Sequence, residues 1–174
     1  PRPAPAPIRA RFGTRFETAG YFTPNIKNKT SGAVGLIQFT EVAIKGWGVT
    51  LNQLAAMTAV QQLDYVEKYL TPYKGRMTDL YNLYLAVFSP AYIGRPDAQK
   101  VYASPSNAYT SNKALDTNND GVITVGEIKS VIDRYIPAGY SAGGTILTSS
   151  SNSMPLFLII AAGLLLFFIL FKRS

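Results

Sequence analysis

The sequence predicts a mainly α-helical domain followed by a single membrane-spanning helix. Two internal segments, at about residues 58–70 and 78–90, have apolar residues at helical spacing. A third segment, residues 154–171, is an uncharged run rich in Leu, Ile and Phe that is long enough to cross a bilayer core. No segment shows convincing strand alternation, so we expect negligible strand content.

Both internal helices have recognisable ends. Thr58 and Gln61 form a capping-box pattern at the start of the first helix, and Pro72 should end it. The second helix should begin at Thr78 as its N-cap and stop before Pro90. Because it is apolar nearly all round, we expect it to be the buried central helix, with tyrosine hydroxyls that need hydrogen-bond partners or face a cleft.

Composition shifts divide the chain into an arm, a main domain, a loop region, a linker, a membrane helix and a tail. The arm is rich in proline and arginine, which favours an extended leader or a tether to a neighbouring protein or an anionic surface. It lacks the apolar centre of a secretory signal. The predicted boundaries are 1–11, 12–103, 104–136, 137–153, 154–171 and 172–174.

The composition excludes several kinds of chemistry. The chain has no cysteine and no histidine, which rules out thiolate or imidazole zinc sites and Ser-His or Cys-His nucleophiles. The net charge of +7 comes mainly from the chain ends, since four arginines lie in the first 15 residues and Lys172 and Arg173 close the chain. The remaining 11 basic and 10 acidic residues nearly balance, so we expect no nucleic-acid binding through the body.

Glu17 is the candidate catalytic acid. It lies beside Phe16, Tyr21 and Phe22, whose burial around the carboxyl would raise its pKa and keep it protonated as a general acid. The alternative is a glutamate on a helix surface next to core aromatic residues. A glycine-punctuated segment, residues 31–40, follows and can fold back over this carboxyl.

Residues 116–127 fit the twelve-residue EF-hand calcium loop at each diagnostic position. Because the sequence holds no second loop of this kind, we favour a structural calcium clip over a sensor that opens a groove. The alternative is a metal-free Asx turn. The expected ligands are Asp116, Asn118, Asp120, the carbonyl of Val122, Thr124 and Glu127.

The basic residues that follow the run at 154–171 predict its orientation. Lys172 and Arg173 come directly after it, whereas no lysine or arginine lies between Arg134 and Met154. The charge rule therefore places the C-terminus on the cytoplasmic or inner side of a bilayer and the folded domain on the other side.

Three short motifs in order resemble those of soluble lytic transglycosylases and goose-type lysozymes. They are Glu-Thr-Ala-Gly-Tyr-Phe at 17–22, Gly-Ala-Val-Gly-Leu-Ile-Gln-Phe at 32–39 and Leu-Tyr-Leu-Ala-Val at 83–87. The chain is most similar to a virion- or prophage-borne subgroup that also has an EF-like loop. This resemblance implies a lysozyme-like α fold with a glycan cleft, with Glu17 as the single catalytic acid. It also implies substrate contacts from Ser31, Gly32, Gly35, Gln38, Phe39 and Tyr84.

The third motif departs from the usual Ala-Tyr-Asn, because Tyr84 is followed here by Leu85 and Ala86. A two-carboxylate glycosidase would need a second acid, and Glu41, the nearest in sequence, lies in no motif. The resemblance therefore implies a lytic transglycosylase that cleaves the β-1,4 bond between N-acetylmuramic acid and N-acetylglucosamine in peptidoglycan, with no cofactor for catalysis. The alternatives are a hydrolytic muramidase of the same fold, and a non-enzymatic virion structural protein or glycan adhesin.

The expected setting is the membrane of a small phage virion, where the enzyme would serve host cell-wall penetration. The runner-up is a bacterial inner membrane with the domain facing the periplasm. The predicted partners are peptidoglycan strands, a lipid bilayer through residues 154–171 and capsid or other virion proteins through the arm at 1–11.

Overall fold

The structure, a computed structural model, describes residues 24–29, 31–134, 136 and 141–143. The described residues fall into two compact units, which divide between Tyr69 and Leu70. Glu17, the arm, the predicted membrane helix and the basic tail all lie outside the described residues.

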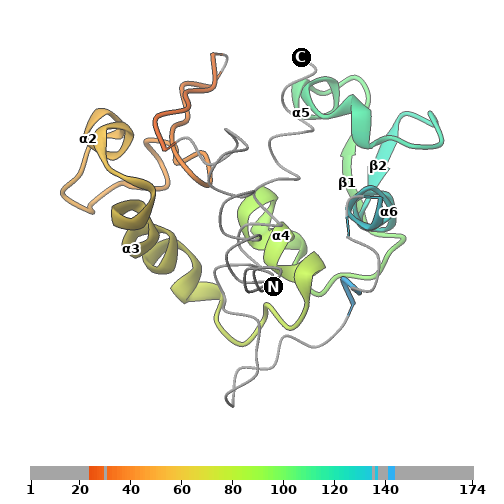
Figure 1. Ribbon diagram of the computed structural model, residues 1–174. Coiled ribbons are helices and arrows are strands. Elements are labelled where there is room, and N and C mark those ends of the chain that lie inside the picture. Colours follow the sequence, from red (N-terminus) through yellow and green to blue (C-terminus); the bar gives the residue numbers. More distant parts are fainter. Residues whose placement is uncertain (1–23, 30, 135, 137–140, 144–174) are drawn as a thin grey trace, which may run out of the picture. The chain divides into compact units, whose positions relative to one another are not determined.

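In the described part of the first unit, residues 24–29 and 31–50 form an irregular segment that precedes two helices (Figure 1). Helix α2 spans Leu51–Ala56 and helix α3 spans Ala59–Leu70. The last residue of α3, Leu70, belongs to the second unit. A capping box formed by Thr50 and Gln53 starts α2. At α3 the predicted cap is confirmed, because the backbone N–H of Thr58 donates to the Gln61 side chain at 2.9 Å.

Before these helices, the chain folds into a compact turn that is closed by isolated β-bridges. Val34 pairs with Lys27 on one side and with Phe39 on the other. Val34 and Phe39 exchange both backbone hydrogen bonds, at 3.0 and 2.7 Å, so residues 35–38 form a four-residue loop between them. Both side chains are 1% exposed, and they anchor this turn in the core of the unit.

The second unit begins with the short 3-10 helix η1, Thr71–Tyr73, and continues into helix α4, Leu80–Phe88. The predicted buried helix is confirmed as an element, since four consecutive α4 residues from Leu83 to Ala86 are buried. Its N-cap is Asp79 and not Thr78, because the Asp79 carboxylate accepts from the Asn82 N–H at 2.8 Å. The 3-10 helix η2, Pro90–Tyr92, follows directly.

The rest of the second unit contains a small sheet that the sequence analysis did not predict. Strands β1, Lys100–Ala103, and β2, Val122–Thr124, pair antiparallel with an irregularity in register. Between them lie helix α5, Asn107–Ser111, and the 3-10 helix η3, Lys113–Leu115. Helix α6, Val125–Asp133, begins where β2 ends and buries Val125, Ile128, Val131 and Ile132.

The predicted fold class is therefore wrong as stated. The structure is partly helical with a two-stranded sheet, whereas we expected a mainly α lysozyme-like domain with negligible strand content. The strands were missed because each has only three or four residues, too few to show alternation, and because their pairing joins segments far apart in sequence.

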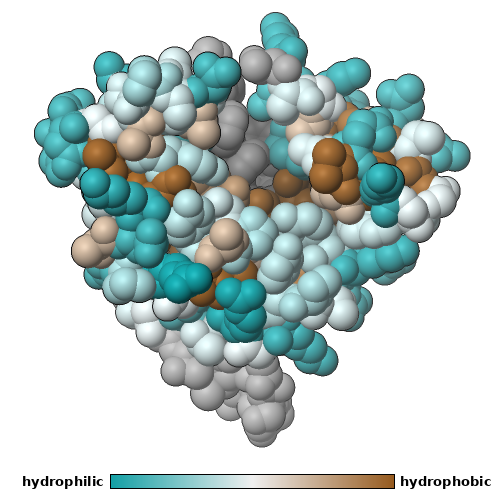
Figure 2. All heavy atoms as spheres, turned by 180° about the vertical axis from the view of Figure 1, so that it is seen from behind, coloured by the Kyte–Doolittle hydropathy of each residue, from teal (hydrophilic) through white to brown (hydrophobic). Residues whose placement is uncertain are grey.

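The predicted transmembrane helix at 154–171 is not supported. Those residues lie outside the described part, and no helix within the described ranges is long and apolar enough to cross a membrane. The prediction depended only on the uncharged, apolar amino-acid composition of residues 154–171. Figure 2 shows one face of the molecule, on which hydrophilic residues predominate and apolar residues form small separate groups.

Candidate functional site

The turn at residues 31–39 holds five of the six residues that the resemblance implies in substrate binding. Ser31 and Gly32 lie at its start, and the Ser31 N–H donates to the Asn28 side chain at 2.9 Å. Gly35 and Gln38 are the first and last residues of the four-residue loop. Phe39 packs inward, with its ring edge-on to Trp47 at 6.3 Å between centroids.

Gln38 has an unusual backbone conformation. Its φ of 57° lies in the left-handed region, which few residues other than glycine adopt. The carbonyl of Gly35 holds it there by accepting from the Gln38 backbone N–H and from its Nε2, each at 3.1 Å. The side chain is half-buried, so a partly accessible amide is fixed at the end of the loop.

The two glycines of this turn have different surroundings. Both have positive φ, 72° at Gly32 and 80° at Gly35. A Cβ added at Gly32 would meet no atom within 4 Å, whereas one at Gly35 would lie 2.5 Å from the Oε1 atom of Gln62. At Gly35, the group that lies closest to the backbone is therefore a side chain of the same unit, that of Gln62.

Gln62 is the residue that sequence reasoning missed in this unit. It lies on α3 with 0% exposure, and its amide makes three hydrogen bonds. The Oε1 atom accepts from the Leu36 N–H at 2.8 Å, while Nε2 donates to the carbonyls of Pro24 and Leu54, each at 2.7 Å. One buried side chain thus joins the turn, the segment at residue 24 and the end of α2.

Tyr84, the sixth predicted contact, lies on α4 in the second unit. Its ring stacks on Phe88 at 5.5 Å, and Phe88 meets Tyr102 edge-on at 5.9 Å. The residue is 2% exposed, and burial raises the pKa of its hydroxyl above the ordinary value. Within the described part of the chain, the Tyr84 hydroxyl is the one buried side-chain polar atom without a hydrogen-bond partner.

The first half of the 116–127 loop is closely hydrogen-bonded. Asp116 is buried, with 5% exposure, and its Oδ1 accepts from the Asp120 N–H at 3.2 Å. Its Oδ2 accepts from the Tyr109 hydroxyl at 2.7 Å and from the Gly121 N–H at 2.9 Å. The hydrogen bond from Tyr109 lowers the pKa of the Asp116 carboxyl, against the opposing effect of burial.

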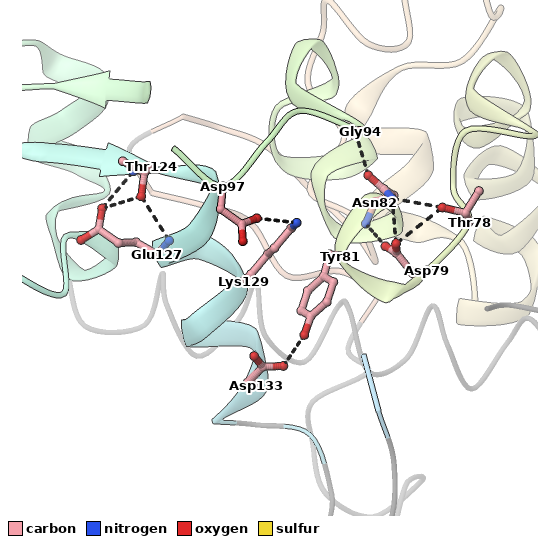
Figure 3. Close-up of polar contacts among 10 residues, drawn as sticks. All are labelled: Thr78, Asp79, Tyr81, Asn82, Gly94, Asp97, Thr124, Glu127, Lys129 and Asp133. Carbon is pink, nitrogen blue, oxygen red and sulfur yellow. Dashed lines mark hydrogen bonds and ion pairs between the residues drawn. The ribbon is translucent and has the colours of Figure 1, made fainter. Parts of the chain in front are cut away.

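The remaining predicted ligands follow the loop into β2 and α6. The Asn118 Oδ1 accepts from the Asp120 N–H at 2.9 Å, and Gly121 supplies the turn with a φ of 84°. Glu127 forms a capping box with Thr124 at the start of α6 (Figure 3). Its Oε1 also accepts from the Thr117 N–H at 2.9 Å, so this carboxylate joins the two ends of the loop.

The side chains of this loop are hard oxygen donors of the kind that Ca²⁺ prefers, and their chemistry fits that ion. The positions of these side chains, however, do not form a complete set of calcium ligands. Nowhere in the described ranges do three acidic, histidine or cysteine side chains gather into a metal-binding group. Glu127 is directed to backbone N–H groups instead of joining Asp116 and Asp120.

Polar contacts tie α6 to the segments around it (Figure 3). The Tyr81 hydroxyl on α4 donates to Asp133 at 2.6 Å, and burial together with this hydrogen bond raises the pKa of Tyr81 to about 12. Lys129 forms an ion pair with Asp97 at 2.7 Å, and its ammonium lies 5.5 Å from the centre of the Tyr81 ring. These contacts hold helix α6, whose first turn contains Glu127.

Comparison with known proteins gave no match among family models, curated proteins or solved structures. The resemblance to lytic transglycosylases therefore remains a prediction that depends on the three ordered motifs.

Proposed function

We propose that this chain is a peptidoglycan-cleaving enzyme of the lytic transglycosylase type, in which Glu17 is the single catalytic acid. It would act on the β-1,4 bond between N-acetylmuramic acid and N-acetylglucosamine. A virion that must pass a host cell wall is the setting we propose for it.

The observation that supports this most is the conformation of Gln38. Strained residues gather at functional sites, where the surrounding structure keeps them in a costly geometry. Gln38 has a φ of 57° within a motif that resembles a glycan-contacting segment. Since its Nε2 is held by the Gly35 carbonyl, its Oε1 is oriented as an acceptor for a sugar hydroxyl.

The proposed reaction uses one carboxyl group in two steps. Glu17 donates its proton to the glycosidic oxygen as the bond from C1 to that oxygen breaks, and the acetamido group of the substrate stabilises the positive centre. The resulting carboxylate then takes the proton of the C6 hydroxyl as that oxygen bonds to C1 and closes a 1,6-anhydro ring. Water in place of the C6 hydroxyl would give the hydrolytic alternative.

We also propose that the 116–127 loop binds one Ca²⁺ ion as a structural clip. The oxygen donors of Asp116, Asn118, Asp120, Val122, Thr124 and Glu127 would hold it, and the ion would offset their negative charge. Because Glu127 already joins both ends of the loop, its carboxylate would exchange hydrogen bonds for a metal contact.

Cleavage of purified peptidoglycan by the full chain tests the proposal. Glu17→Gln should abolish cleavage, whereas the matched control Glu41→Gln, at an exposed position outside the motifs, should retain it. Mass spectrometry of the products distinguishes anhydromuropeptides from hydrolysed ends. A calcium chelator should lower thermal stability while Glu17→Gln should not. Full activity of Glu17→Gln would refute the assignment, and loss of activity in Glu41→Gln would indicate two carboxylates.

A further inference from the structure

We infer that Gln62 is a positioning residue, which sets the orientation of Gln38 through a single peptide group of the 35–38 loop. The inference rests on the proposed function, because it takes Gln38 as a glycan contact.

The Gly35–Leu36 peptide group is the physical link between the two glutamines. Its N–H end donates to Gln62 Oε1 at 2.8 Å. Its carbonyl end accepts from the backbone N–H and from the Nε2 of Gln38, each at 3.1 Å. Because a peptide group is planar and rigid, fixing the direction of the N–H also fixes the direction of the carbonyl.

Gln62 is itself held firmly, so it can serve as the fixed end of this link. Its Nε2 donates to the carbonyls of Pro24 and Leu54 at 2.7 Å each, which uses both hydrogens of the amide. The side chain is fully buried on α3. An amide whose oxygen and two hydrogens are all hydrogen-bonded inside the protein has one orientation. This orientation fixes the direction of the Leu36 N–H in the loop.

Gly35 completes the fit between the helix and the loop. A Cβ at this position would lie 2.5 Å from Gln62 Oε1, so the hydrogen bond to Leu36 requires a residue without a side chain there. The loop therefore rests directly on the Gln62 amide. If Gln62 only filled space, an apolar side chain of the same size would serve as well.

The test compares cleavage of soluble, uncrosslinked peptidoglycan strands by the full chain and its variants. Gln62→Met keeps the length of the side chain but removes the hydrogen bonds. We expect it to lower kcat/KM about tenfold, mainly through KM, as expected for one lost substrate hydrogen bond. Val66→Ala, on the same buried face of α3, is the control for lost stability and should leave kcat/KM within about twofold.

A double-mutant cycle shows whether Gln62 acts through Gln38. In a Gln38→Ala background, Gln62→Met should change kcat/KM by less than about twofold, because the group that it positions is gone. A merely structural role would give the same loss in both backgrounds. Equal losses, or wild-type kinetics in Gln62→Met, would overturn the inference.

Gln62→Glu provides a second test in case Gln62→Met does not fold. A protonated glutamic acid has nearly the shape of glutamine, and it can accept from Leu36 and donate one hydrogen to the carbonyl of Pro24 or Leu54. An ionised glutamate has no hydrogen to donate, and its negative charge would face both carbonyl oxygens. Relative to wild type we therefore expect near-normal kinetics at pH 5 and the Gln62→Met defect at pH 8. If neither variant folds at either pH, Gln62 is needed for the fold and the inference is wrong. An inactive wild-type chain would instead refute the proposed function.

Discussion

Replacing Gly35 by alanine gives the sharpest test of how the loop is built. Alanine at a φ of 80° costs about 1 kcal/mol in backbone strain. The new Cβ would also lie 2.5 Å from Gln62 Oε1 and would push the amide away from Leu36. Overpacking of about 1–3 kcal/mol and a lost hydrogen bond of about 1 kcal/mol bring the expected loss of unfolding free energy to about 3–5 kcal/mol.

Gly32→Ala is the matched control for this variant. Gly32 has a similar φ of 72°, but an added Cβ there meets nothing within 4 Å. It should therefore lose only the backbone strain, about 1 kcal/mol. Urea unfolding can be followed by the fluorescence of Trp47, the one tryptophan in the chain, which lies in the same unit.

The difference between the two alanine variants isolates the contact with Gln62. We expect the unfolding free energy of Gly35→Ala to be about 2–4 kcal/mol lower than that of Gly32→Ala. Equal losses would show that the Gln62 amide can move aside at no cost, and the account of a loop resting on that amide would then be wrong.

Two tyrosines of the second unit yield further predictions. Tyr84→Phe removes a buried hydroxyl without a described partner, so urea unfolding should show a gain of about 1 kcal/mol; a clear loss would mean that the hydroxyl has a partner beyond the described residues. Tyr81 has a pKa raised from 10.0 to about 12, so its hydroxyl keeps its proton in the folded state at pH values where the unfolded chain has lost it. Its contribution should be complete below pH 10 and disappear as the pH rises towards about 12. The stability advantage of wild type over Tyr81→Phe should shrink across that range, and a constant difference would contradict the raised pKa.

Local sequence signals predicted the start of α3 correctly and the N-cap of α4 to within one residue. The cap at Thr58 was recognisable because its partner Gln61 lies three positions along the chain. The pattern at 116–127 was recognisable for the same reason, because the Asp116 and Glu127 carboxylates accept from backbone N–H groups within the same twelve residues. The calcium expected there remains a prediction.

Contacts between distant segments could not be predicted in this way. Strand β1 forms only because residues 100–103 meet residues 122–124. In the sequence, Gln61 and Gln62 are two adjacent polar residues near the start of α3. Gln62 lies four positions before the buried Val66 and eight positions before the buried Leu70. That spacing places it on the apolar face of the helix, where a polar side chain must find partners inside the protein.

The pairing of β2 with β1 has a consequence for how the 116–127 loop would respond to calcium. The strand inside the loop, Val122–Thr124, has its hydrogen-bonding partner within its own unit, and Ile123 at its centre is fully buried. A loop supported in this way does not rely on a second loop to complete it. Occupancy would therefore rise with calcium concentration as for one independent site, gradually and without a threshold.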